Sequence, residues 1–141
     1  MPTRTAKARW TGRLKDGQGT MSVGSGACEG PYSFASRFAE GDGTNPEELI
    51  GAAHAGCFSM ALSMILEQAG HPPESIETSA EVTIEQVDDG FSITGIALTC
   101  RARVPGMDRG TFADSARAAK EGCPVSKALA GTHITLDATL E

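Results

Sequence analysis

Residues 45 to 73 have the sequence NPEELIGAAHAGCFSMALSMILEQAGHPP, which predicts one long helix from about residue 46 to 69. Asn45 is a good N-cap, Pro46 suits the first helical position, and Gly70 before two prolines ends the helix. Apolar residues recur along it at spacings of three and four, namely Ile50, Ala53, Cys57, Met60, Ala61 and Met64. We expect a helix this apolar to be buried against another element.

Short strands are expected on both sides of this helix. Glycines punctuate residues 5 to 39, and the mixed runs between them predict short antiparallel strands. Downstream, residues 80 to 85 alternate apolar and polar side chains. A turn at residues 88 to 90 then leads into a second strand over residues 91 to 104, which predicts a hairpin with one solvated face. The apolar phase of that strand shifts at Gly95, where we expect a β-bulge.

Two more helices and a last strand complete the expected fold. Residues 108 to 121 form a helical candidate that ends at Gly122, and Pro124 can open a short helix after it. Residues 134 to 140 alternate as a strand. No linker, internal repeat or low-complexity tract interrupts the chain, so residues 1 to 141 are expected to form one domain. The predicted architecture is α+β, with helices packed on antiparallel sheets.

The composition excludes several classes of partner. A net charge of −6 without a block rich in lysine and arginine argues against binding of nucleic acid. No apolar export signal follows the first residues, and no stretch reaches the roughly 20 apolar residues that a membrane span needs. We therefore expect a soluble, cytoplasmic protein that binds neither nucleic acid nor membrane. The chain lacks a phosphate loop, a dinucleotide fingerprint and a Cys-x-x-Cys pair, so no bound cofactor is expected.

The four cysteines lie in contrasting surroundings. Cys57 lies some three turns into the long helix, so burial would raise its pKa and its reactivity would require a nearby cation. Cys123 follows a helix-ending glycine, at or near an N-cap where free N–H groups favour a thiolate. Cys100 shares the phase of its apolar neighbours, which predicts a core residue. Cys28 lies among glycines, which predicts a loop thiol. An inert packed thiol at Cys57 and an ordinary turn thiol at Cys123 remain alternatives.

Three other residues could act on Cys57. Arg37 is the leading candidate for the cation, on an expected strand whose aromatic residues take the other face, although a solvated strand arginine fits the same pattern. Glu47 would stabilise the helix dipole or orient Arg37 through a bidentate ion pair. Ten residues of straight helix separate Glu47 from Cys57 by about 15 Å, so Arg37 would have to span the gap or a partner subunit supply one group. His54 is interpreted as a packed core histidine.

Three motifs resemble the osmotically inducible protein C (OsmC) family. They are NPEELI at residues 45–50, AHAGCFSMAL at 53–62 and GCPVSKAL at 122–129. The resemblance extends nearly from end to end, through WTG at 10–12 and ITLD at 134–137. It is closer to the OsmC branch than to the organic hydroperoxide resistance (Ohr) branch.

The resemblance implies a thiol peroxidase without a bound cofactor. Its fold would be an intertwined α+β homodimer, with antiparallel sheets around a long central helix and two active sites at the subunit interface. Cys57 would attack an organic hydroperoxide and become a sulfenic acid, and Cys123 would condense with it to form a disulfide. By the same analogy Arg37 activates Cys57 and Glu47 holds Arg37. A dithiol would reduce the disulfide, and lipoyl groups serve in the Ohr branch.

Three further functions remain open on the sequence. A non-enzymatic redox sensor needs only a reactive Cys57 and a partner surface, and turnover with a dithiol separates it from an enzyme. A hydrolase would use Cys57 with His54, but no orienting acid or oxyanion donor is identifiable. A zinc site would need more ligands than this His-x-x-Cys pair supplies.

Overall fold

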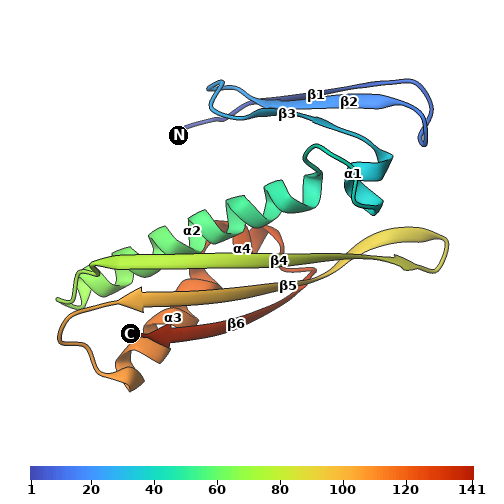
Figure 1. The fold of residues 1–141 in the computed structure, drawn as a ribbon. Coiled ribbons are helices and arrows are strands. Elements are labelled where there is room, and N and C mark those ends of the chain that lie inside the picture. Colours follow the sequence, from blue (N-terminus) through green and yellow to red (C-terminus); the bar gives the residue numbers. More distant parts are fainter. The chain divides into compact units, whose positions relative to one another are not determined.

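The computed structural model describes all 141 residues and divides into two compact units, Met1–Leu49 and Ile50–Glu141. The boundary falls inside the long helix, α2 (Pro46–Gln68). The first unit holds three strands, a short helix and the start of α2, and the second holds the rest of α2 with three strands and two helices (Figure 1). That residues 1 to 141 fold as one domain stays a prediction.

The first unit is built on a small antiparallel sheet. Its strands, in the order β1-β2-β3, are β1 (Ala6–Thr11), β2 (Gln18–Val23) and β3 (Glu29–Tyr32). Trp10 on β1 packs against Tyr32 on β3, with ring centroids 5.4 Å apart. The short antiparallel strands predicted before residue 39 are therefore confirmed.

The prediction of a strand around Arg37 was wrong, because residues 34 to 38 form a helix, α1 (Phe34–Phe38). Ser33 is its N-cap: the Ser33 hydroxyl accepts the N–H of Ser36, and the Ser36 hydroxyl accepts the N–H of Ser33. This capping box satisfies backbone groups that a strand would leave to a neighbour. Phe34 and Phe38 lie four positions apart with ring centroids at 5.0 Å, so the aromatic spacing also fits one helical turn. Arg37 therefore lies in the last turn of a helix.

The long helix begins where the sequence predicts. Asn45 Oδ1 accepts the N–H of Glu48 at 2.8 Å, which is the hydrogen bond of an N-cap. Pro46 opens the helix and Gln68 ends it, one residue before the expected end. Gly70 follows with a φ of +86°, a left-handed conformation that glycine adopts without strain.

The second unit holds a sheet in the order β4-β5-β6. Its elements are β4 (Ser75–Val87), β5 (Gly90–Arg103), α3 (Arg109–Gly122), α4 (Pro124–Ala128) and β6 (His133–Leu140). The antiparallel β4–β5 hairpin and both later helices confirm their predictions. In contrast to the expected antiparallel sheet, β6 pairs parallel to β5. The two intervening helices make this possible, since they return the chain from the end of β5 to the other end of that strand, where β6 begins.

The predicted bulge lies one residue from its expected position. Thr83 pairs with Gly95 and Ile84 pairs with Ile93, so Thr94 is the extra residue on β5. Because of this insertion, the apolar side chains of β5 change from odd-numbered positions before the bulge to even-numbered positions after it. The shift in apolar phase thus has the predicted cause.

One face of this sheet carries the core. The fully or almost fully buried residues are Phe58, Leu62 and Leu66 of α2, Ile96, Leu98, Cys100 and Ala102 of β5, and Phe112, Ala116 and Ala119 of α3. Burial alternates along β4, β5 and β6, so the opposite face is the more exposed one. The hairpin with one solvated face is confirmed, and α2 lies along β4 and β5 within this unit (Figure 1).

The buried face of α2 differs from the predicted one. His54 and Phe58 are buried, whereas Met60 and Met64, which belong to the predicted stripe, are 77% and 54% exposed. Two apolar stripes share the helix, and spacing alone does not say which one meets the sheet. By length and composition α2 would also pass as a membrane span, contrary to expectation. Core helices of globular proteins pass the same test, and α2 packs its Phe58 face into a core.

Candidate active site

Two thiols meet in the second unit. Cys57 lies on α2, Cys123 separates α3 from α4, and their sulfur atoms are 2.8 Å apart. Both cysteines are free thiols, and they are 66 positions apart in the sequence. The structure therefore brings together the two cysteines that the sequence singled out, in direct contact.

The two thiols differ in access. Cys57 is half-buried, whereas Cys123 has no exposed surface. A small molecule from solvent can therefore reach Cys57 first, and Cys123 contacts what Cys57 becomes. Their positions suit a nucleophile and a resolving thiol respectively.

The surroundings favour negative charge on Cys123 over Cys57. Burial raises the pKa of Cys57, and its hydrogen bond with Cys123 raises it further. Burial also opposes ionisation of Cys123, but hydrogen bonds from Cys57, Ser126 and the Val125 N–H outweigh it, so the pKa of Cys123 is lowered. As expected, Cys123 lies at an N-cap, that of α4. Cys57 therefore still needs a cation to become a nucleophile at neutral pH.

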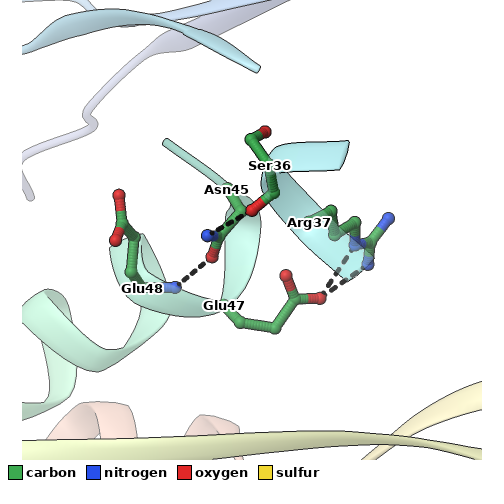
Figure 2. Close-up of polar contacts among 5 residues, drawn as sticks. All are labelled: Ser36, Arg37, Asn45, Glu47 and Glu48. Carbon is green, nitrogen blue, oxygen red and sulfur yellow. Dashed lines mark hydrogen bonds and ion pairs between the residues drawn. The ribbon is translucent and has the colours of Figure 1, made fainter. Parts of the chain in front are cut away.

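A partly buried ion pair lies in the first unit. Arg37 Nε and Nη2 donate to Glu47 Oε1 at 2.9 and 2.8 Å (Figure 2). This differs from the expected bidentate pair, because both N–H groups share one carboxylate oxygen. Glu47 Oε2 is buried without a partner. The Arg37 side chain keeps 36% of its surface exposed, and the Glu47 side chain keeps 7%.

A second set of contacts holds the ends of α1 and α2 in place around this pair. Asn45 Nδ2 donates to the Ser36 carbonyl at 3.0 Å, while Asn45 Oδ1 caps α2 through the N–H of Glu48 (Figure 2). The Arg37 guanidinium also lies over the Phe38 ring, 5.3 Å from its centroid. Arg37 is thus held on one side by a carboxylate and on another by an aromatic ring.

An apolar cavity of about 250 Å³ adjoins Arg37 in the first unit. Apart from Ser33, it is lined by Arg37 and by Trp10, Leu14, Tyr32, Phe34 and Phe38. Its walls are mostly aromatic with a single cation, so it suits a ligand with a hydrocarbon body and one polar end.

His54 is the core residue that the sequence predicts. It has no exposed surface, its Nε2 lies 2.7 Å from the Ser126 hydroxyl, and burial lowers its pKa. The structure pairs its Nε2 with Ser126 rather than with Cys57, and no three His, Cys, Asp or Glu side chains converge as a metal site would require. Neither the hydrolase nor the zinc site has geometric support. Cys100 is buried in the core and Cys28 is exposed, as predicted.

Ser126 is a site residue that the sequence analysis missed. It is the third residue of α4 and lies three positions after the N-cap residue Cys123, and its side chain hydrogen-bonds Cys123. A serine three positions after an N-cap commonly reaches back toward that cap, as Ser36 does to Ser33 in α1. The spacing of Cys123 and Ser126 was therefore a usable signal.

Comparison with known proteins assigns the family. Residues 39–138 match the family model of the OsmC-like proteins. The chain belongs to the OsmC-like family. The peroxiredoxin OsmC of Escherichia coli (strain K12) is 52% identical over 139 residues, which cover 98% of this chain and 96% of that protein. The organic hydroperoxide resistance protein of Xanthomonas axonopodis pv. citri (strain 306) is 37% identical over 103 residues, 72% of this chain and 68% of that protein.

Solved structures of OsmC-like proteins share the fold. The organic hydroperoxide resistance protein OhrB of Bacillus subtilis superposes with a TM-score of 0.68 at 26% identity, covering 97% of this chain and 98% of its own. An OsmC protein from Legionella pneumophila has a TM-score of 0.73 at 24% identity, covering 100% and 98%. The recognised family and the α+β fold class, with two sheets and a long helix, are both confirmed.

In this OsmC-like chain the four predicted site residues form two pairs. Cys57 and Cys123 meet in the second unit, and Arg37 and Glu47 meet in the first. In the thiol pair the two sulfur atoms are in direct contact. The ion pair presents a fixed guanidinium beside an apolar cavity.

Proposed function

We propose that this chain is a cysteine-based peroxidase that reduces organic hydroperoxides, with Cys57 as the nucleophile and Cys123 as the resolving thiol. The contact between a reachable Cys57 and a fully buried Cys123 at 2.8 Å carries the proposal. The relatives named peroxiredoxin and organic hydroperoxide resistance protein support the same class of reaction.

The proposed reaction has three steps. The Cys57 thiolate attacks one peroxide oxygen, so an S–O bond forms, the O–O bond breaks, and the leaving alkoxide takes a proton to become an alcohol. The Cys123 thiolate then attacks the sulfenic sulfur of Cys57, and the departing hydroxide takes a proton to become water. A dithiol, for which a lipoyl group is the candidate, exchanges with the resulting disulfide and returns both thiols to the reduced state.

Arg37 is the proposed activator of Cys57. The surroundings of Cys57 raise its pKa, so the thiolate needs a cation that does not itself lose its proton, and a guanidinium meets that requirement. Glu47 is the proposed positioning residue, since it is almost fully buried and accepts two hydrogen bonds from Arg37. The guanidinium comes to Cys57 from the same chain or from a partner subunit.

The aromatic cavity supports a substrate with a hydrocarbon part. A cavity of about 250 Å³ beside Arg37 accommodates the body of an alkyl or aryl hydroperoxide while the peroxide group stays near the guanidinium. Hydrogen peroxide has no apolar part and gains nothing from these walls. We therefore infer a preference for organic hydroperoxides. We also propose that the protein is cytoplasmic and that neither nucleic acid nor membrane is its partner.

We also propose that the chain works as a homodimer, and we expect sedimentation of the reduced protein to give twice the chain mass. The exposed stripe of Met60 and Met64 on α2 supports this, because an apolar helix face in solution gains from being covered. A charge at Met60 (Met60→Glu) should weaken the dimer at least about tenfold, since burial of one Met is worth about 1.5–3 kcal/mol. Val87→Glu, at the exposed hairpin end, is the matched control. A wild-type protein that sediments as a monomer would contradict the dimer.

One experiment tests the catalytic proposal. Fully reduced protein is mixed with cumene hydroperoxide and dihydrolipoamide, peroxide loss is followed, and the oxidised protein is mapped by mass spectrometry. We expect sustained turnover and a bond between Cys57 and Cys123. A single stoichiometric oxidation in the presence of the dithiol would point instead to a redox sensor. A disulfide that involves Cys28 but not Cys123 would contradict the resolving role of Cys123.

A further inference from the structure

His54 and Ser126 form a buried polar pair that the three reaction steps leave unused. His54 on α2 has no exposed surface, and Ser126 on α4 is 6% exposed. Their Nε2 and Oγ atoms lie 2.7 Å apart, although 72 positions of sequence separate the residues. Polar groups in an apolar core cost free energy unless they are paired, so this contact has a definite hydrogen-bond arrangement.

The position of one hydrogen decides that arrangement. Ser126 has a single hydroxyl hydrogen, and its side chain hydrogen-bonds Cys123 as a donor. The Ser126 oxygen must then accept from His54, which places the imidazole proton on Nε2. His54 Nδ1 is buried without a partner, which fits a bare acceptor better than an N–H group, because unpaired buried N–H groups are rare. A neutral imidazole is what burial at this position favours.

We propose that His54 and Ser126 form a buried relay that holds a hydrogen-bond donor on the sulfur of Cys123 during disulfide formation. The order of donation runs from His54 Nε2–H to Ser126 Oγ, and from Ser126 O–H to Cys123 Sγ. Both are positioning residues, since they act through Cys123. The inference rests on the proposed function, in which Cys123 is the resolving thiol.

The relay matters most in the second step of the reaction. In the reduced protein the Cys123 thiol donates to Cys57. Once Cys123 is ionised it accepts from the Cys57 thiol instead, but that S–H no longer exists when Cys57 is a sulfenic acid. Ser126 is then the side-chain donor that remains on Cys123. The step forms one S–S bond and breaks one S–O bond, and the proton that Cys123 gives up leaves with the hydroxide as water. The titratable groups that face Cys123 in this network are Cys57, and His54 through Ser126.

Single-turnover kinetics separate the two steps. After mixing with cumene hydroperoxide, samples are quenched with dimedone and an alkylating agent, and mass spectrometry counts the sulfenic acid and the disulfide. In Ser126→Ala we expect oxidation of Cys57 at the wild-type rate. Disulfide formation should be slowed about tenfold at neutral pH and should recover at higher pH, as a raised pKa of Cys123 would produce. Ser126→Thr keeps the hydroxyl and should restore the wild-type pH profile.

Substitutions at His54 test the other end of the relay. His54→Leu removes the donor to Ser126 and should slow disulfide formation as Ser126→Ala does. His54→Gln keeps an N–H near the place of Nε2, so its rate of disulfide formation should fall between those of His54→Leu and the wild type. A Ser126→Ala variant with the wild-type rate and pH profile of disulfide formation would overturn the relay. In that case Cys57 oxidation would still support the peroxidase.

Nitrogen NMR of the reduced wild-type protein tests the relay without activity or mutation. We expect His54 to be neutral at pH 7 with its proton on Nε2, because burial lowers its pKa. A proton on Nδ1 would overturn the proposed direction of donation. Because this measurement uses the wild-type protein, it tests the relay even where the core variants fail to fold. Conversely, a wild-type Cys57 that resists oxidation by the hydroperoxide would contradict the proposed peroxidase function, whatever tautomer His54 has.

Discussion

Replacement of Cys57 by serine is expected to abolish turnover of organic hydroperoxide, by at least about three orders of magnitude. A serine hydroxyl is far less acidic than a thiol, and no adjacent general base is placed to activate it, because the nearest histidine, His54, is engaged by Ser126. The measurement is peroxide consumption by the reduced variant with dihydrolipoamide in excess. Multiple turnover by Cys57→Ser at the wild-type rate would contradict the role of Cys57.

Cys123→Ser should behave differently from Cys57→Ser in the same assay. Cys57 can still attack the peroxide, so each subunit should consume about one equivalent and then stall as a sulfenic acid without a resolving thiol. Trapping with dimedone should label Cys57 in this variant. The matched control is Cys28→Ser, which removes an exposed loop thiol and should keep wild-type turnover. Two different failures in the two serine variants would establish the order of the two oxidation steps.

Replacement of Arg37 by methionine should slow the first oxidation step about 10- to 100-fold at neutral pH. Methionine keeps much of the apolar length of the side chain but removes the guanidinium. The pKa of Cys57 should then rise above its value in the wild type. Below its pKa the thiolate fraction falls about tenfold for each pKa unit of that rise, and the difference should vanish as the pH passes the higher pKa. The measurement is the rate of Cys57 oxidation against pH, in the Cys123→Ser background.

Arg13→Met is the control for Arg37→Met. Arg13 forms an exposed ion pair with Asp16 in the same unit, with 88% of its side chain exposed, so its loss should leave the pH profile unchanged. Glu47→Gln should give a smaller effect than Arg37→Met, because the guanidinium stays charged but loses the carboxylate that orients it. An Arg37→Met profile that matches the wild type would remove Arg37 from the site.

The elements of the fold that depend on local chemistry were predictable. The cap at Asn45 and the proline after it placed the start of α2 at the observed residue, since a cap satisfies N–H groups within one turn. The bulge was visible as a change of apolar phase near Gly95. The helix α1 was missed, because residues 34 to 38 alternate like a strand while the deciding interaction is the capping box between Ser33 and Ser36.

Pairing over long sequence distances was less accessible. The parallel register of β6 on β5 depends on where two helices return the chain, and the alternation of β6 is the same for either direction. The choice of the buried face of α2 likewise depended on the shape of the sheet that covers it. Two apolar stripes were present, and the one that includes Phe58 proved complementary to β5.

For the site, the sequence by itself determined which residue types carry the chemistry: two thiols in unlike helical positions, a cation and a carboxylate, in motifs specific enough to indicate the family. Only the tertiary structure decided that Cys57 and Cys123 touch, that Cys123 is the one with the lowered pKa, and that Ser126 links it to His54. The physical reason is that a thiol's pKa depends on the donors and the burial around its sulfur. These are contributed by helices that are far apart in the chain and meet when the core forms.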